Sequence, residues 1–191
     1  MKLKLLLLFS LVITAFFFLV SCDTYDKVTT LNPKTGRFNA YNVNVKITTA
    51  SKANTDTLKK LIIVPNSSYW IGMVKNMNYF DEIMTFSDMD MDITKKGLAD
   101  KIPSLTDKIG LNRAYNLYRP FFVLYFTQEL KNNQLYFGLA LYDPGKVETI
   151  FENKVFVNHS VLDRTDQKTM YPLFNSLLDY LHGLEKIKTK K

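Results

Sequence analysis

Three strand-like segments between residues 121 and 157 constrain the fold more than any other part of the sequence. They are rich in aromatic and β-branched residues, which favour strands. Between them lie two runs of turn-forming residues, Lys131-Asn132-Asn133 and Asp143-Pro144-Gly145-Lys146. The strands predicted in this way are Phe121–Thr127, Leu135–Tyr142 and Val147–Val157. Because short turns join them, we predict an antiparallel meander, with an irregularity near Asn153.

A helix is predicted to close the domain. Apolar residues recur there at three- and four-residue steps, at Met170, Leu173, Phe174, Leu177, Leu181 and Leu184. Pro172 falls in the first turn, where its missing N–H costs nothing. The single apolar face predicts that this helix packs on the sheet.

The segments before the meander predict a mixture of strands and helices. Val43, Val45 and Ile47 alternate with polar residues and predict a half-buried strand, and a loop is predicted over Thr49–Thr57. The continuous apolar run Leu61–Val64 predicts a central strand buried on both faces.

Between residues 68 and 118, the patterns predict three helices and one strand. Trp70, Met73, Val74 and Met77 share one helical face. The predicted boundaries are Ser68 as the N-cap of this first helix, a strand over Tyr79–Phe86, a helix capped by Ser87 and Asp90 and ended by Pro103, and a helix over Leu105–Tyr118.

Taken together, these elements predict an α+β fold, or an α/β fold with a mixed sheet. We expect a single two-layer or three-layer domain that ends in the antiparallel meander and the closing helix. The mature length of about 170 residues suits one domain.

The N-terminus has the features of a secretory signal. Lys2 and Lys4 precede an apolar stretch from Leu5 to Val20. As a helix, these sixteen residues would span roughly 24 Å, which is short for a bilayer core of about 30 Å.

The four residues Leu19-Val20-Ser21-Cys22 resemble a bacterial lipobox. This resemblance to bacterial lipoproteins implies cleavage between Ser21 and Cys22, a diacylglyceryl group on the Cys22 thiol and acylation of the new amine. Cys22 is the only cysteine, so an intramolecular disulfide is impossible. The alternatives are an ordinary cleaved signal and an uncleaved N-terminal helix.

These observations predict four regions. They are a signal peptide over residues 1–21, a lipidated N-terminus with a flexible tether over 22–42, a globular domain over 43–185 and a basic tail over 186–191. The tail holds Lys186, Lys188, Lys190 and Lys191, and we expect a solvated, frayed end, with contact to anionic lipid as the alternative. Loss of Lys2 and Lys4 with the signal lowers the formal net charge from +7 to +5.

No residue pattern predicts catalysis, a cofactor or a metal ion. Asp88, Asp90 and Asp92 lie at alternate helix positions, which point in different directions, so we expect them to complement the helix dipole instead of binding a metal. His159, Ser160 and Asp163 could form a triad on paper, but neighbours in sequence rarely do so. We expect His159 in a loop and His182 on the polar face of the last helix. The export signal also argues against a nucleic-acid partner.

The order of elements from Lys59 onward is similar to the envelope domain shared by the curli-secretion lipoprotein, the penicillin-binding-protein activator lipoprotein and the TolB N-terminal domain. The residues that carry the resemblance are KKLIIVPN, FDEIMTFSDMDMDITKKGLADKI and FFVLYFTQEL–QLYFGLALYDP. It implies a protein-binding domain that docks on envelope machinery and can form homo-oligomers.

Two functions follow as hypotheses. The first is a non-enzymatic adaptor that binds another envelope protein, which predicts an exposed apolar patch or free sheet edge. The second is a carrier or sensor of a small apolar or cell-wall-derived ligand, which predicts a closed pocket lined by aromatics such as Trp70, Tyr118 and Phe126. In either case acylated Cys22 would hold the chain on a bilayer, the outer membrane in preference to the inner. The domain would then lie in the periplasm or at the cell surface.

Overall fold

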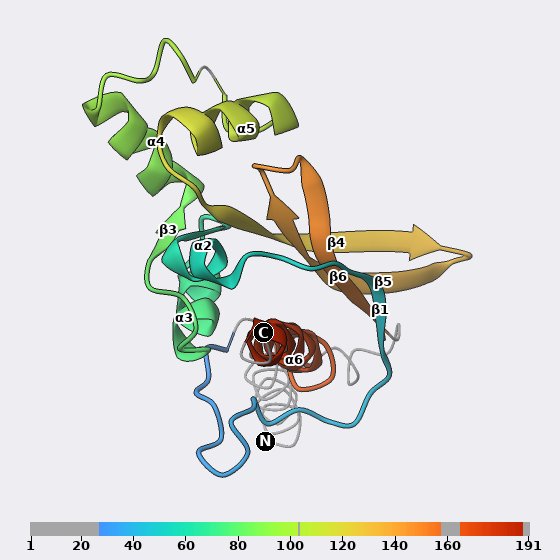
Figure 1. The fold of residues 1–191 in the computed structure, drawn as a ribbon. Coiled ribbons are helices and arrows are strands. Elements are labelled where there is room, and N and C mark those ends of the chain that lie inside the picture. Colours follow the sequence, from blue (N-terminus) through green and yellow to red (C-terminus); the bar gives the residue numbers. More distant parts are fainter. Residues whose placement is uncertain (1–26, 103, 158–164, 189–191) are drawn as a thin grey trace, which may run out of the picture.

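The computed structural model describes residues 27–102, 104–157 and 165–188 (Figure 1). Within these residues the strands form a six-stranded sheet in the order β1-β6-β5-β4-β2-β3. The strands are β1 (Val45–Ala50), β2 (Ile62–Val64), β3 (Ile83–Thr85), β4 (Phe122–Lys131), β5 (Gln134–Asp143) and β6 (Glu148–Val157). The helices are α2 (Thr55–Lys60), α3 (Ser68–Asn76), α4 (Phe86–Lys95), α5 (Lys108–Leu117) and α6 (Met170–Lys188).

The sheet is mixed. Strand β2 runs parallel to both β3 and β4, whereas β4, β5, β6 and β1 pair antiparallel with their neighbours. The predicted fold class is therefore confirmed, including the β4–β5–β6 meander and the C-terminal helix.

Two apolar cores lie on opposite faces of the sheet. Alternate residues of β2 and of Leu61, the extended residue before it, point to opposite sides, so Ile62 and Val64 join one core and Leu61 and Ile63 join the other. Helices α3 and α6 cover the first core, and α4 and α5 cover the second, which gives three layers (Figure 1). The prediction that Leu61–Val64 is buried on both faces is confirmed, because none of these residues is more than 1% exposed.

Several predicted boundaries in the first half were wrong. The expected loop over Thr49–Thr57 instead contains the end of β1 and the start of α2, which Asn54 caps through a hydrogen bond from Asp56 N–H. The expected strand over Tyr79–Phe86 is reduced to the three residues of β3, where pairing with β2 holds the chain extended.

The helix starts lie one to three residues from their predicted positions, and the end of α4 lies eight residues before its predicted position. Ser67, not Ser68, caps α3. Thr85 and Asp88, not Ser87 and Asp90, form the capping box of α4. Helix α4 ends at Lys95 rather than at Pro103, because Gly97 takes a left-handed backbone with φ of 67°. Helix α5 begins at Lys108, after Asp107 as its N-cap, and α6 runs on to Lys188.

Residues 27–42, which we expected to belong to a flexible tether, lie against α6. Phe38 is 2% exposed, with its ring 5.9 Å from the rings of both Tyr171 and Phe174. The Asn175 side chain accepts from Phe38 N–H at 2.8 Å and donates to Phe38 C=O at 2.9 Å. The Tyr171 hydroxyl donates to the carbonyl of Lys27 at 2.7 Å. This segment is thus part of the folded domain.

Asn153 joins the sheet to α6. Its side chain is fully buried, accepts from Leu139 N–H at 3.1 Å and donates to Leu173 C=O at 2.9 Å. The β1–β6 register shifts between Ile47 and Thr49, beside this residue, which confirms the predicted irregularity. Among the described residues, no helix is long and apolar enough to cross a bilayer.

The hydrogen bonds by which Asn153 joins the sheet to α6 can be tested by mutation. We expect Asn153→Ala to lower the free energy of unfolding by about 3 kcal/mol, because it removes both hydrogen bonds of a fully buried side chain and opens a small cavity. Asn116→Ala, on the exposed surface of α5, should change it by less than about 0.5 kcal/mol. Urea unfolding of the two variants, followed by circular dichroism, measures the difference. Equal effects would show that Asn153 does not hold α6 in place.

Candidate functional site

Strand β1 presents a free edge of the sheet. Among the residues that the structure describes it pairs only with β6, so no described strand pairs with the backbone donors and acceptors of its other side. The opposite edge strand, β3, is only three residues long. Natural sheets blunt or cover long exposed edges, and an open one can pair with another chain.

A groove with a mixed polar and apolar lining runs beside this edge. Val45 and Ile47 pair with Val155 and Asn153, which are buried beneath α6, so both side chains lie on the α6 side of the sheet. Ile47 is nevertheless 52% exposed. Residues of β1, α6 and the segment 35–43 enclose a groove of about 600 Å³, whose apolar lining includes Phe38, Tyr41, Val43, Val45, Ile47 and Pro172.

The far wall of the groove is fixed in place. Phe38 is held by Asn175, as described above, and Tyr41 N–H donates to Gln167 C=O at 2.8 Å. An ion pair between Arg37 and Asp179 joins the wall to α6. A preformed wall reduces the ordering entropy that a bound partner must overcome.

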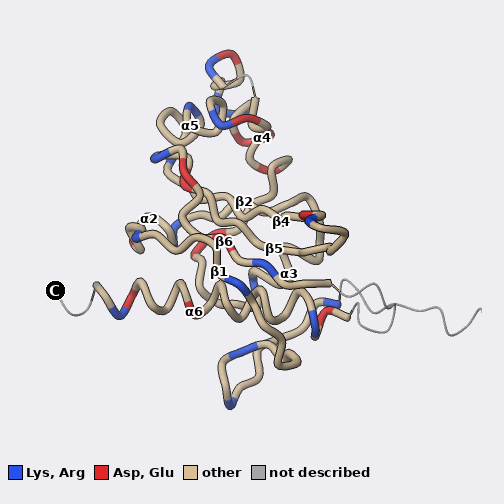
Figure 2. Tube along the Cα trace, turned by 90° about the vertical axis from the view of Figure 1, so that its right-hand side faces the viewer, with Lys and Arg blue, Asp and Glu red and all other residues tan. Residues whose placement is uncertain are grey.

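The charged residues that line the groove, Arg37 and Asp179, form an ion pair, and further basic residues lie around the groove. Lys46 lies on β1 and Lys52 follows it, and the basic positions beside β1 can be seen in Figure 2. The ammonium of Lys168 lies 5.7 Å from the centre of the Tyr41 ring. The site therefore favours a partner that carries carboxylates near an apolar extended segment.

Several residues singled out in the sequence lie outside the described part of the chain. These are Ser21, Cys22, His159, Ser160 and Asp163. His182 is exposed on α6, as expected, with its ring 6.2 Å from that of Tyr79.

The aromatic residues proposed to line a ligand pocket do not meet. Trp70 and Phe126 pack together on the α6 side of the sheet, with ring centres 5.9 Å apart. Tyr118 packs on the opposite core and donates its hydroxyl proton to Asp92 at 2.5 Å. Burial raises the pKa of Tyr118 to about 12. The prediction of one pocket formed by all three was wrong, because they cover different faces.

The three aspartates of α4 have separate surroundings. Asp88 accepts from Thr85 N–H at 2.9 Å and from its hydroxyl at 2.7 Å, and these hydrogen bonds lower the pKa of Asp88. Asp92 accepts from Lys96 at 2.8 Å and from Tyr118, and these bonds lower the pKa of Asp92. Asp90 lines a separate hollow together with Phe86 and Tyr125, which is described below. In the part of the chain that the structure describes, no three His, Cys, Asp or Glu side chains could hold a metal ion together.

The groove was not predicted because residues 35–42 were assigned to the tether and only Val43 to the domain. Phe38, Tyr41 and Val43 are apolar residues in an otherwise polar segment, and they were the available signal. Their partner, Pro172, is about 130 residues away, so no local pattern could pair them.

Comparisons with solved structures show distant likeness. The match to the LpoB C-terminal domain from Salmonella enterica covers 53% of this chain and 84% of that domain, at 17% sequence identity and a TM-score of 0.35. The match to the same domain from Escherichia coli covers 56% of this chain and 88% of that domain, at 17% sequence identity and a TM-score of 0.35. The match to a chain of the PelC dodecamer from Paraburkholderia phytofirmans covers 70% of this chain and 96% of that one, at 10% sequence identity and a TM-score of 0.34.

These likenesses are too distant to carry a function to this chain. No protein-family model matches the sequence, and no curated protein matches it. Membership of the envelope-domain group named above stays a prediction.

The capping box of α4 gives a pH-dependent prediction. Thr85→Val keeps the backbone hydrogen bond to Asp88 but removes the hydroxyl, so we expect a loss of about 1 kcal/mol and a partial rise in the pKa of Asp88. Because that pKa is lowered by folding, the stabilisation is complete at neutral pH and disappears as the pH falls below the ordinary aspartate range.

The measurement is the carboxyl carbon shift of Asp88 across an acid titration, combined with urea unfolding at neutral pH. Thr94→Val on the exposed face of the same helix is the matched control. If Asp88 titrates alike in Thr85→Val and Thr94→Val, the capping hydroxyl does not set its pKa.

Proposed function

We propose that this protein is a lipid-anchored adaptor of the bacterial cell envelope, without enzymatic activity, which binds an extended segment of another envelope protein. The observation that carries the proposal is the free edge of β1 beside a preformed groove that is partly lined by apolar side chains. This is the exposed edge and patch that the adaptor hypothesis predicted.

A strand added to β1 would fit both features. Its backbone would pair with the unpaired groups of β1, as in other cases of β-strand addition. Every second side chain would then point to the α6 side, next to Val45 and Ile47, and enter the groove. Backbone pairing would supply affinity, and the groove would select apolar side chains.

The charge of the chain favours a different protein over a second copy. The formal net charge is +7, or +5 without the signal residues, so two copies repel each other at long range. Lys46 and Lys52 beside the edge instead attract a segment flanked by Asp or Glu. Association should therefore weaken as salt rises.

The anchor in this proposal rests on the lipobox resemblance at Leu19-Val20-Ser21-Cys22. Two acyl chains give stable membrane attachment, since each buried methylene contributes about 0.8 kcal/mol. The outer membrane is the proposed location, with the domain in the periplasm or at the cell surface.

Lipidation is tested with Cys22→Ala. We expect the native chain to incorporate an alkyne-labelled fatty acid and to fractionate with membranes, and the variant to do neither, because the acceptor thiol is gone. Ser21→Ala, a small residue at the same junction, should still be labelled. Labelling of Cys22→Ala would refute acylation at this position.

Docking is tested by photo-crosslinking in cells, with a photoreactive residue at position 41 in the groove of the full-length protein. We expect one discrete adduct that Ile47→Glu reduces at least about tenfold, since it places a charge in the apolar contact. The control is Ile109→Glu on α5, where the side chain is 68% exposed and far along the sheet from β1.

The size and sequence of the adduct decide the outcome. A different envelope protein, cross-linked through an acidic and apolar segment, supports the proposal. An adduct of two copies of this chain overturns the choice of partner. Crosslinking that is equal in Ile47→Glu and Ile109→Glu overturns the site.

A further inference from the structure

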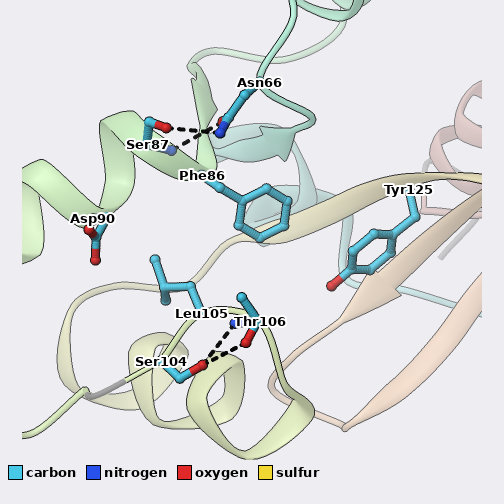
Figure 3. Close-up of a pocket in the computed structure, with 8 residues that line it drawn as sticks. All are labelled: Asn66, Phe86, Ser87, Asp90, Ser104, Leu105, Thr106 and Tyr125. Carbon is cyan, nitrogen blue, oxygen red and sulfur yellow. Dashed lines mark hydrogen bonds between the residues drawn. The ribbon is translucent and has the colours of Figure 1, made fainter.

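A second hollow lies away from β1, toward the other edge of the sheet, beyond the carboxyl ends of the parallel strands β2 and β3. It has a volume of about 590 Å³ and is lined from the loop after β2, the start of α4, the segment before α5 and strand β4 (Figure 3). No part of it belongs to the groove beside β1.

The topology of the chain creates this hollow. After β2 the chain turns into α3, which covers the α6 side of the sheet. After the neighbouring strand β3 it turns into α4, which covers the other side. Two adjacent parallel strands whose connections leave toward opposite faces form a crevice at their carboxyl ends, and ligands of open α/β sheets bind in such crevices.

The walls combine an aromatic surface with fixed polar groups. The rings of Phe86 and Tyr125 are stacked, with centres 6.2 Å apart and planes at 30°. Asn66 donates to the Ser87 hydroxyl at 2.8 Å and accepts from Ser87 N–H at 3.2 Å, which holds that side of the rim in place.

Other polar groups of the lining are available to a ligand. The carboxylate of Asp90 and the hydroxyl of Tyr125 form no hydrogen bond with the described residues, and Figure 3 shows the Phe86 ring between these two side chains. Burial raises the pKa of Tyr125 to about 12, so its hydroxyl stays protonated and can donate. Ser104 and Thr106 add two further hydroxyls, which share a hydrogen bond with each other at 2.9 Å and keep free lone pairs as acceptors.

We propose that this hollow binds a neutral sugar ring. The C–H face of a sugar can lie on the aromatic surface, since aromatic faces carry negative charge and attract polarised hydrogens. Its hydroxyls would donate to the Asp90 carboxylate and exchange hydrogen bonds with Tyr125 and Thr106. Asp90 carries the one formal charge among the lining residues, so sugars with a carboxylate or phosphate are repelled.

The test uses the full-length protein in a detergent whose headgroup contains no sugar. Saturation-transfer NMR and calorimetry are run with N-acetylglucosamine, galactose and glucuronate as probes. We expect a neutral sugar to bind with a dissociation constant on the order of millimolar, as suits a ligand of this size, and glucuronate to bind at least about tenfold more weakly.

Two variants that keep the shape of the site locate the binding. Asp90→Asn should weaken the neutral sugar about tenfold or more, and Tyr125→Phe about threefold to tenfold. Asp100→Asn, an exposed residue outside the hollow with the same change of charge, should bind as the native protein does. Circular dichroism confirms that each variant is folded.

Three results would overturn the proposal. These are no transfer to either neutral sugar, stronger binding of glucuronate, and binding that Asp90→Asn and Tyr125→Phe leave unchanged. None of them bears on docking at β1, which the crosslinking above tests separately.

Discussion

The rest of the structure depends on the burial of β2 on both faces. Leu61 and the three residues of β2 form a continuous apolar run that cannot leave either side to water, so helices must cover both. The chain meets this requirement by sending α3 to one side and α4 with α5 to the other. The three layers and the crevice at the carboxyl ends of β2 and β3 are therefore consequences of one constraint.

On the side of the first core, α6 has two roles. The carbonyl of Leu173 accepts a hydrogen bond from the buried side-chain amide of Asn153, and this bond fixes the helix on the sheet. Through Asn175 it holds Phe38 and with it the wall of the groove. A change that shifts α6 should thus alter both the sheet edge and the groove, because one rigid element supports them.

The sequence predicted the parts of the fold whose signals are local. The meander follows from its turn residues, and α6 follows from the spacing between Met170 and Leu184. The cap of α4 was misplaced because Thr85 with Asp88 and Ser87 with Asp90 have the same local pattern, and only the pairing of β3 with β2 distinguishes them. The groove and the crevice join segments far apart in sequence, which no periodicity reveals. Phe38 was missed for this reason.

The packing of residues 27–42 on α6 limits how far the domain could lie from a lipid anchor of the kind proposed at Cys22. Only five peptide units separate Cys22 from Lys27, whose carbonyl is bound to Tyr171, and five extended residues reach at most about 17 Å. With a lipid on Cys22, the domain would lie close to the bilayer surface instead of at the end of a long flexible linker. Its search for partners would then be a lateral one, across a surface, where a modest affinity suffices because both molecules are confined to the same thin layer.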